Sequence, residues 1–135
     1  MEQSEMLSLL KEYFGPLSNV RLVFLFGSVV RNMLGPESDI DVAVQFQRIP
    51  NTYELQNIKE DLTEKLHREI DLVTLNQASP ILRMQVLKNG IPVLVKEAAE
   101  YCRFFTDTIS QYDDLKRVRR PSENNILKGR IYAGP

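Results

Sequence analysis

Two aspartates separated by one residue, Asp39 and Asp41, are the side chains whose type and spacing suggest chemistry most directly. They lie in the segment SDIDVAVQF, which alternates as a half-buried β-strand does, so both carboxylates share one face with Cα atoms about 7 Å apart. Two unit charges ~4 Å apart repel by roughly 4 kcal/mol at an effective dielectric constant of about 20. A divalent cation can offset this repulsion, and Mg²⁺ prefers one or two carboxylates together with phosphate oxygens and water. The pair is therefore a candidate magnesium site, with a solvated strand face as the alternative.

A Gly-Ser turn, Gly27 and Ser28, follows the apolar run VRLVFLF and precedes the two aspartates. Glycine has no Cβ, so it leaves the backbone open to close approach, and the serine hydroxyl can donate a hydrogen bond. A short helix predicted at 29–33 would add free backbone N–H groups at its start. A corner of this composition can hold phosphate groups.

A third carboxylate, Asp71, lies in the segment IDLVTL with apolar residues on either side, as Asp41 does. If the two strands are neighbours, three aspartates meet at one edge of the sheet. They could then hold two metal ions ~4 Å apart, which would orient a nucleoside triphosphate for an in-line displacement. Glu69 lies on the same face of this strand and is the alternative to Asp71 as the third carboxylate.

These residues need a framework of strands and helices, and the hydrophobic periodicity supplies one. Leucines at intervals of three or four predict an amphipathic helix after the second strand, while Ser79, Pro80 and Gly90 are typical of the two ends of another helix. Pro92 favours an edge position for the last strand. The expected helices are about 4–14, 52–67, 80–89 and 97–119, and the expected strands are 20–26, 38–46, 70–75 and 91–95.

The composition fits one globular domain, since 43% of the 135 residues are hydrophobic and 26% are charged. A net charge of -1 gives no overall field toward nucleic acid or an anionic membrane, and direct nucleic-acid binding is not expected. No apolar run approaches the ~20 residues that span a bilayer. We expect a soluble, cytoplasmic protein organised as a core at 1–96, a helix at 97–120 that packs on the core or on a partner, and an extended or poorly ordered tail at 121–135.

The last predicted helix carries more aromatic residues than one core-facing stripe needs. Tyr101, Phe104, Phe105 and Tyr112 spread around it, so some of them should be exposed and could contact a partner protein or a second copy of the chain. Core packing alone is the alternative. The single cysteine, Cys102, lies on the apolar stripe and is interpreted as a small core residue.

The order of the chemical features resembles the signature of the DNA polymerase beta-type nucleotidyltransferase superfamily. Gly27 and Ser28 are followed by ten intervening residues and then by Asp39 and Asp41, and Asp71 follows on a later strand. The resemblance implies an α/β (α+β) fold in which a small mixed sheet is flanked by helices, with a long C-terminal helix. It also implies that the Gly-Ser pair touches the triphosphate of ATP, that Asp39 and Asp41 bind Mg²⁺, and that Asp71 binds metal and helps deprotonate the acceptor hydroxyl.

Within this superfamily the chain is similar to minimal nucleotidyltransferases that act as antitoxins beside HEPN-domain ribonuclease toxins. The resemblance implies an antitoxin of a type VII system that forms a hetero-oligomer with its toxin and transfers AMP from ATP to a toxin tyrosine. The alternatives are an antitoxin that neutralises by binding alone and a nucleotidyltransferase acting on a small molecule such as an aminoglycoside.

One motif departs from the common pattern. Many relatives read Gly-Ser-x-Ala-Arg-Gly, whereas this chain reads GSVVRN, so Arg31 keeps its place while Val30 and Asn32 replace alanine and glycine. The change bears on loop shape or substrate choice more than on the carboxylates. Arg31 is kept as a phosphate or structural contact.

Overall fold

The computed structural model of the chain describes residues 2–27 and 39–127, with side chains as far as residue 117. The predicted helices and strands in these ranges are all present, and the helix predicted at 29–33 lies outside them. In chain order the elements are α1 (Gln3–Phe14), β1 (Val20–Phe26), β2 (Ile40–Phe46), α2 (Thr52–Leu66), β3 (Ile70–Thr74), the 3-10 turn η2 (Leu75–Gln77), α3 (Pro80–Asn89), β4 (Ile91–Val95) and α4 (Ala98–Leu127).

The four strands form one mixed sheet in the order β3-β2-β1-β4. β1 runs antiparallel to β2 and to β4, whereas β2 and β3 are parallel and are joined by α2 as a crossover. The strand that contains Pro92 is at an edge, as predicted. The shared direction of β2 and β3 brings their first residues to the same end of the sheet, where β1 ends.

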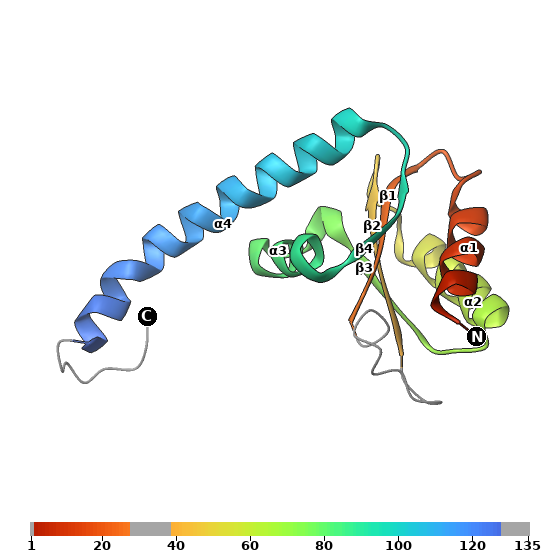
Figure 1. Cartoon of the computed structure of the whole chain (residues 1–135), viewed down its shortest axis with the longest axis horizontal. Coiled ribbons are helices and arrows are strands. Elements are labelled where there is room, and N and C mark those ends of the chain that lie inside the picture. The colour runs from red at the N-terminus through yellow and green to blue at the C-terminus, as the bar shows by residue number, and fades with distance from the viewer. Residues whose placement is uncertain (1, 28–38, 128–135) are drawn as a thin grey trace.

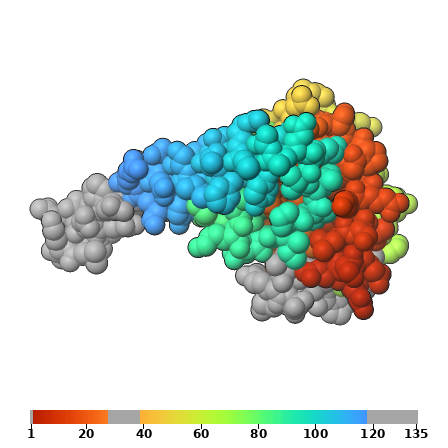
Figure 2. Space-filling model, turned by 45° about the horizontal axis from the view of Figure 1, so that its top comes forward, coloured from red at the N-terminus to blue at the C-terminus, as the bar shows by residue number. Residues whose placement is uncertain are grey.

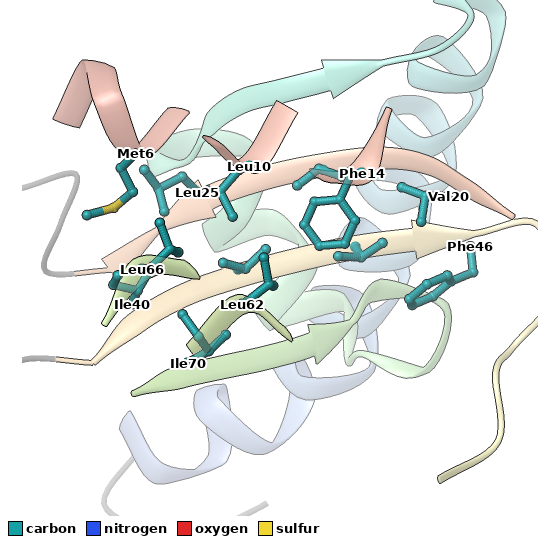
Figure 3. Close-up of a cluster of buried hydrophobic side chains, with 13 residues drawn as sticks. Met6, Leu10, Phe14, Val20, Leu25, Ile40, Phe46, Leu62, Leu66 and Ile70 are labelled. Carbon is teal, nitrogen blue, oxygen red and sulfur yellow. The ribbon is translucent and has the colours of Figure 1, made fainter. Parts of the chain in front are cut away.

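The helices cover both faces of this sheet (Figure 1). α1 and α2 pack on one face, and the larger hydrophobic cluster lies between them and the strands (Figure 3). Ile40, Val42 and Val44 point into this cluster from alternate positions of β2, which confirms the predicted alternation. The cluster consists of Met6, Leu10, Phe14, Val20, Val23, Leu25, Ile40, Val42, Val44, Phe46, Leu62, Leu66 and Ile70.

A second, smaller cluster lies on the other face, beneath α3 and α4. It contains alternate residues of β1, which is buried on both faces as its continuous apolar run predicts. Leu22, Phe24, Ala43, Leu75, Val86 and Phe104 form it.

Local sequence signals explain where the helices begin and end. The side chain of Asn51 accepts a hydrogen bond from the N–H of Glu54, whose carboxylate accepts one in return from the N–H of Asn51, so α2 starts with a capping box. His67 ends α2 in the left-handed conformation at φ 54°. Ser79 caps α3 by accepting from the N–H of Leu82 at 3.2 Å, as predicted.

α4 is the longest helix and projects beyond the rest of the molecule (Figures 1 and 2). Its first turn is tied to β1 because Arg21 donates two hydrogen bonds to Glu100, at 2.8 and 2.9 Å. The tail predicted from residue 121 is expected to be extended or poorly ordered, whereas the helix continues to Leu127, so residues 121–127 are not extended. A proline has a φ compatible with a helix but lacks the backbone N–H and crowds the carbonyl four residues earlier, so Pro121 is an unfavourable residue that α4 nevertheless includes.

The exposed and buried positions of α4 differ in part from the expectation. Phe104 is buried and Phe105 is 43% exposed, which confirms that some of the aromatic residues are exposed. Cys102 is exposed, so its interpretation as a core residue is wrong. The physical reason is that α4 meets the sheet along a narrow stripe, and the face that includes Cys102 has no element packed on it within the described residues. No helix in the described ranges is both long and apolar enough to cross a membrane.

Candidate active site

The register of the sheet brings two of the predicted aspartates together. Parallel pairing aligns Asp41 of β2 with Asp71 of β3, and antiparallel pairing aligns Phe26 of β1 with Asp41. Aligned residues point to the same face, so the three side chains form a row across neighbouring strands on the face covered by α3 and α4. Asp39 precedes β2 by one residue, and the alternation assigns it to the same face as Asp41.

The exposure of these carboxylates differs along the row. Asp41 is partly buried, whereas Asp71 and Asp39 are exposed to solvent. Glu69, the alternative third carboxylate, is also exposed and precedes β3 by one residue. The aligned position of Asp71 beside Asp41 is therefore the feature that distinguishes it from Glu69.

Gly27 lies at the end of β1 directly beside this row. Its φ of 82° is a left-handed value that side-chain-bearing residues rarely adopt. A Cβ at this position would overlap Oδ2 of Asp41 and lie 2.8 Å from its Cγ. Glycine is thus required twice, by the turn and by the carboxylate packed against it. Ser28 and Arg31 lie outside the described residues.

The donor set suits a hard cation. Carboxylates on two neighbouring strands are ligands that Mg²⁺ accepts together with phosphate oxygens and water. Among the residues described, no three His, Cys, Asp or Glu side chains are grouped closely enough to hold a metal ion by themselves. Asp39, Asp41 and Asp71 therefore do not form a closed group of three carboxylates in this structure.

A cavity of about 280 Å³ lies beside Gly27, on the side away from Asp41 and Asp71. It is lined by Phe26 and Gly27 from the end of β1 and by Gln85 and Asn89 from α3. Sequence analysis did not single out these two amides. Their spacing of four residues on one helix face was the available signal, but exposed amides at this spacing are common on any solvated helix.

A larger cavity, of about 410 Å³, lies at the opposite end of the strands, where β1 begins and β2 ends. Arg21 and Glu100 line it, and the hydrogen bond from Arg21 is the main cause that holds the pKa of the Glu100 carboxyl below its ordinary value. Arg83 also lines it and donates to the carbonyl oxygens of Leu75 and Asn76, at 2.9 and 3.1 Å. Although this cavity is larger, it lies at the end of the strands opposite to Asp41 and Gly27, so it is not part of the candidate site.

A mixed sheet with a glycine turn at the end of one strand, and aspartates on the next two strands across the sheet, is typical of nucleotidyltransferases. The family model described as "Polymerase beta, Nucleotidyltransferase" matches residues 9–99, and the chain belongs to this family. The expectation drawn from the Gly-Ser and aspartate motif is confirmed at the level of the family and the fold.

Named relatives narrow the class. The chain is 25% identical over 127 residues to the protein adenylyltransferase MntA of Shewanella oneidensis, which covers 94% of this chain and 88% of the relative. It is similar to a chain in the crystal structure of a toxin-antitoxin with AMP-PNP, with a TM-score of 0.76, 25% identity and coverage of 93% and 98% of the two chains. It is also similar to a chain in the complex of a tri-AMPylated Shewanella oneidensis HEPN toxin with its MNT antitoxin, with a TM-score of 0.73, 25% identity and coverage of 94% and 99%.

Proposed function

We propose that this protein is a type VII antitoxin that acts as an Mg²⁺-dependent protein adenylyltransferase. It transfers AMP from ATP to a tyrosine hydroxyl of a cognate HEPN-domain ribonuclease toxin in the cytoplasm and so inactivates the toxin. The observation that carries the proposal is the register that aligns Asp41 with Asp71 beside Gly27. The similarity to MntA and to the chain in the complex with a tri-AMPylated HEPN toxin supports the choice of reaction and partner.

The chemistry is a displacement at the α-phosphorus of ATP. The tyrosine oxygen forms a bond to this phosphorus, the bond to the β-phosphate bridging oxygen breaks, and pyrophosphate leaves. Asp39, Asp41 and Asp71 would hold Mg²⁺, which supplies charge neutralisation of the triphosphate when bound. Gly27 and Ser28 hold the phosphates, since the bare backbone at residue 27 permits close approach.

The position of Asp71 supports a role for it on the acceptor side of the reaction. β3 is an edge strand and Asp71 is exposed, so a toxin tyrosine can reach it from solvent, whereas Gly27 lies on the other side of Asp41. The Asp71 carboxylate accepts the phenol proton as the new oxygen–phosphorus bond forms. The loss of this proton makes the tyrosine oxygen a stronger nucleophile.

The decisive test compares two neighbouring carboxylates. Asp71→Asn should abolish AMP transfer to the toxin, whereas Glu69→Gln removes an equally exposed charge two residues away and should leave transfer intact. Intact-mass measurement of the toxin after incubation with ATP and Mg²⁺ gives the number of adenylyl groups added. Equal loss in both variants, or no adenylyl group on the toxin with the unmodified protein, contradicts the proposal.

Neutralisation by binding alone is the second candidate, and the 43% exposed Phe105 on the projecting α4 favours it. The double variant Asp39→Asn/Asp41→Asn separates the two functions, because it removes the proposed Mg²⁺ ligands without altering α4. Toxin activity that stays blocked when AMP transfer is lost assigns the function to binding. Toxin activity that returns assigns it to transfer.

A further inference from the structure

We infer that the cavity between β1 and α3 receives the nucleoside end of ATP and that Gln85 and Asn89 select adenine. The inference rests on the proposed function and adds to it the residues that choose the nucleotide. It starts from the position of the cavity, which adjoins the glycine corner on the side away from Asp71.

The sheet order sets a direction across the site. β3 carries Asp71, β2 carries Asp41, and β1 ends at the glycine corner, with the cavity beyond it. The end of α3 is held close to β1, since a Cβ on Gly90 would lie 3.5 Å from the carbonyl oxygen of Leu25. If the triphosphate of a nucleotide lies beside Gly27 and Asp41, its sugar and base can therefore enter the cavity that the described residues form between the end of β1 and α3.

The lining of the cavity suits an uncharged group. Within the described part of the chain, the residues that line it, Phe26, Gly27, Gln85 and Asn89, carry no formal charge. Its volume of about 280 Å³ is just under the ~300–1,000 Å³ of sites that enclose a whole drug-sized ligand, so it fits a base with its sugar better than a complete nucleotide. The charged triphosphate would thus lie beside the aspartates on one side of Gly27, and the neutral nucleoside in the uncharged cavity on the other.

The side chains in the cavity match a purine base. Phe26 is half-buried against the smaller hydrophobic cluster and offers an aromatic surface on which a base can stack. Gln85 and Asn89 are exposed and lie one helical turn apart on α3. An amide side chain has both a donor and an acceptor, and this pair of groups matches N7 and the N6 amino group of adenine, whereas guanine presents two acceptors there.

The experiment measures nucleotide binding by the full chain with Mg²⁺ and without toxin, using titration calorimetry. The probes are ATP, GTP and inorganic tripolyphosphate. The test variant is Gln85→Ala/Asn89→Ala, and the matched control is Gln56→Ala/Asn57→Ala, which removes the same two amides from an exposed part of α2 on the other side of the sheet. Thermal unfolding of each variant shows that it is folded.

The unmodified protein should bind ATP more tightly than GTP. The test variant should lose about tenfold in ATP affinity, which corresponds to ~1.4 kcal/mol. It should bind GTP and tripolyphosphate as before, while the control variant keeps the preference. An unchanged ATP-to-GTP ratio in the test variant, or no preference in the unmodified protein, overturns the inference.

The proposed function fails by a different result. Adenine preference that depends on Gln85 and Asn89, combined with no adenylyl group on the toxin, supports the inference and contradicts protein adenylylation. If the toxin is adenylylated but the preference for ATP over GTP persists in the Gln85→Ala/Asn89→Ala variant, the proposed function is supported and the inference about these two residues is contradicted.

Discussion

The two faces of the sheet differ in how they are packed. Beneath α1 and α2, the buried residues of the larger cluster are at most 3% exposed, and a cavity on this side has described lining residues from the two helices and not from the strands. Beneath α3 and α4 the cluster is smaller, and cavities reach the strands at both ends. The same strands thus present a closed hydrophobic layer to one side and binding space, together with the aspartate row, to the other. The difference favours a division in which stability depends mainly on one face and the proposed catalysis takes place on the other.

The largest expected effect is a loss of AMP transfer with little loss of stability. Gly27→Ala should lower AMP transfer about 100-fold or more, because the added Cβ overlaps Oδ2 of Asp41. The left-handed φ of 82° should add a stability cost of only ~1–2 kcal/mol. Initial rates by intact mass and urea unfolding measure the two effects. Gly15→Ala is the control, since Gly15 has an ordinary helical φ of -53° and lies at the end of α1. Full transfer activity in Gly27→Ala would contradict the assignment of the corner.

A matched pair of leucines compares the stability of the two faces. Leu10 and Leu75 are both 0% exposed, and each lies in a different cluster. Leu10→Ala should cost about 3–5 kcal/mol of unfolding free energy and Leu75→Ala about 2–3, because the smaller cluster borders open cavities and can relax more easily around the lost atoms. Urea unfolding of both variants measures the difference. A larger cost for Leu75→Ala would reverse the comparison.

A smaller effect on stability is expected from a hydrogen bond between α1 and α2. The Tyr13 hydroxyl donates a hydrogen bond of 2.8 Å to Asp61, which joins α1 to α2. Tyr13→Phe should cost ~0.5–1.5 kcal/mol. Burial, followed by the contact with Asp61, raises the pKa of Tyr13 above its ordinary value of 10.0, so this stabilisation is complete below that pH and is lost as the pH rises further. Stability measured against pH should therefore fall less steeply above pH 10 in the variant. Tyr53→Phe, at a residue 75% exposed, should change neither quantity.

The smallest effect concerns the far end of the α3/α4 face. Hydrogen bonds from Arg21 lower the pKa of Glu100, while its burial opposes them. A carboxyl with a lowered pKa contributes stability above its ordinary pKa of 4.5, and this contribution disappears as the pH falls through the lowered value. Glu100→Gln should therefore flatten the decline of stability in acid. Glu97→Gln is the control, because Glu97 is 68% exposed and lies 3.7 Å from Arg21. An equal change in both variants would show that the half-buried pair of Arg21 and Glu100 contributes no more to the pH dependence of stability than the exposed Glu97 does.

The sequence allowed most of the framework to be predicted because its local signals agree. Alternation in β2, the caps at Ser79 and Gly90, and the continuous apolar run of β1 each specify an element without knowledge of the rest of the chain. The errors fall in α4. The sequence predicts a tail that begins at residue 121, whereas the helix continues to Leu127. Cys102 follows a helical period whose buried stripe is narrower than the period alone indicates.

The candidate site was predictable only in part, for a reason that concerns sheet topology. The spacing of Asp39 and Asp41 is local and visible, but the neighbour relation of β2 and β3 depends on how α2 crosses the sheet. The resemblance to a known family supplied that relation. The cavity at Gln85 and Asn89 had no comparable signal, because two amides on a helix acquire meaning only when α3 packs against the end of β1.

The parallel pairing of β2 with β3 has a consequence for how the proposed site is completed during synthesis and folding. Antiparallel β1 and β2 place Gly27 beside Asp41, whereas Asp71 reaches them through the longer β2-α2-β3 crossover. During synthesis the ribosome releases the glycine corner and Asp41 before it releases the third carboxylate. If Asp71 has the catalytic role proposed for it, a growing chain can begin to fold before it can catalyse, because the site needs the completed crossover.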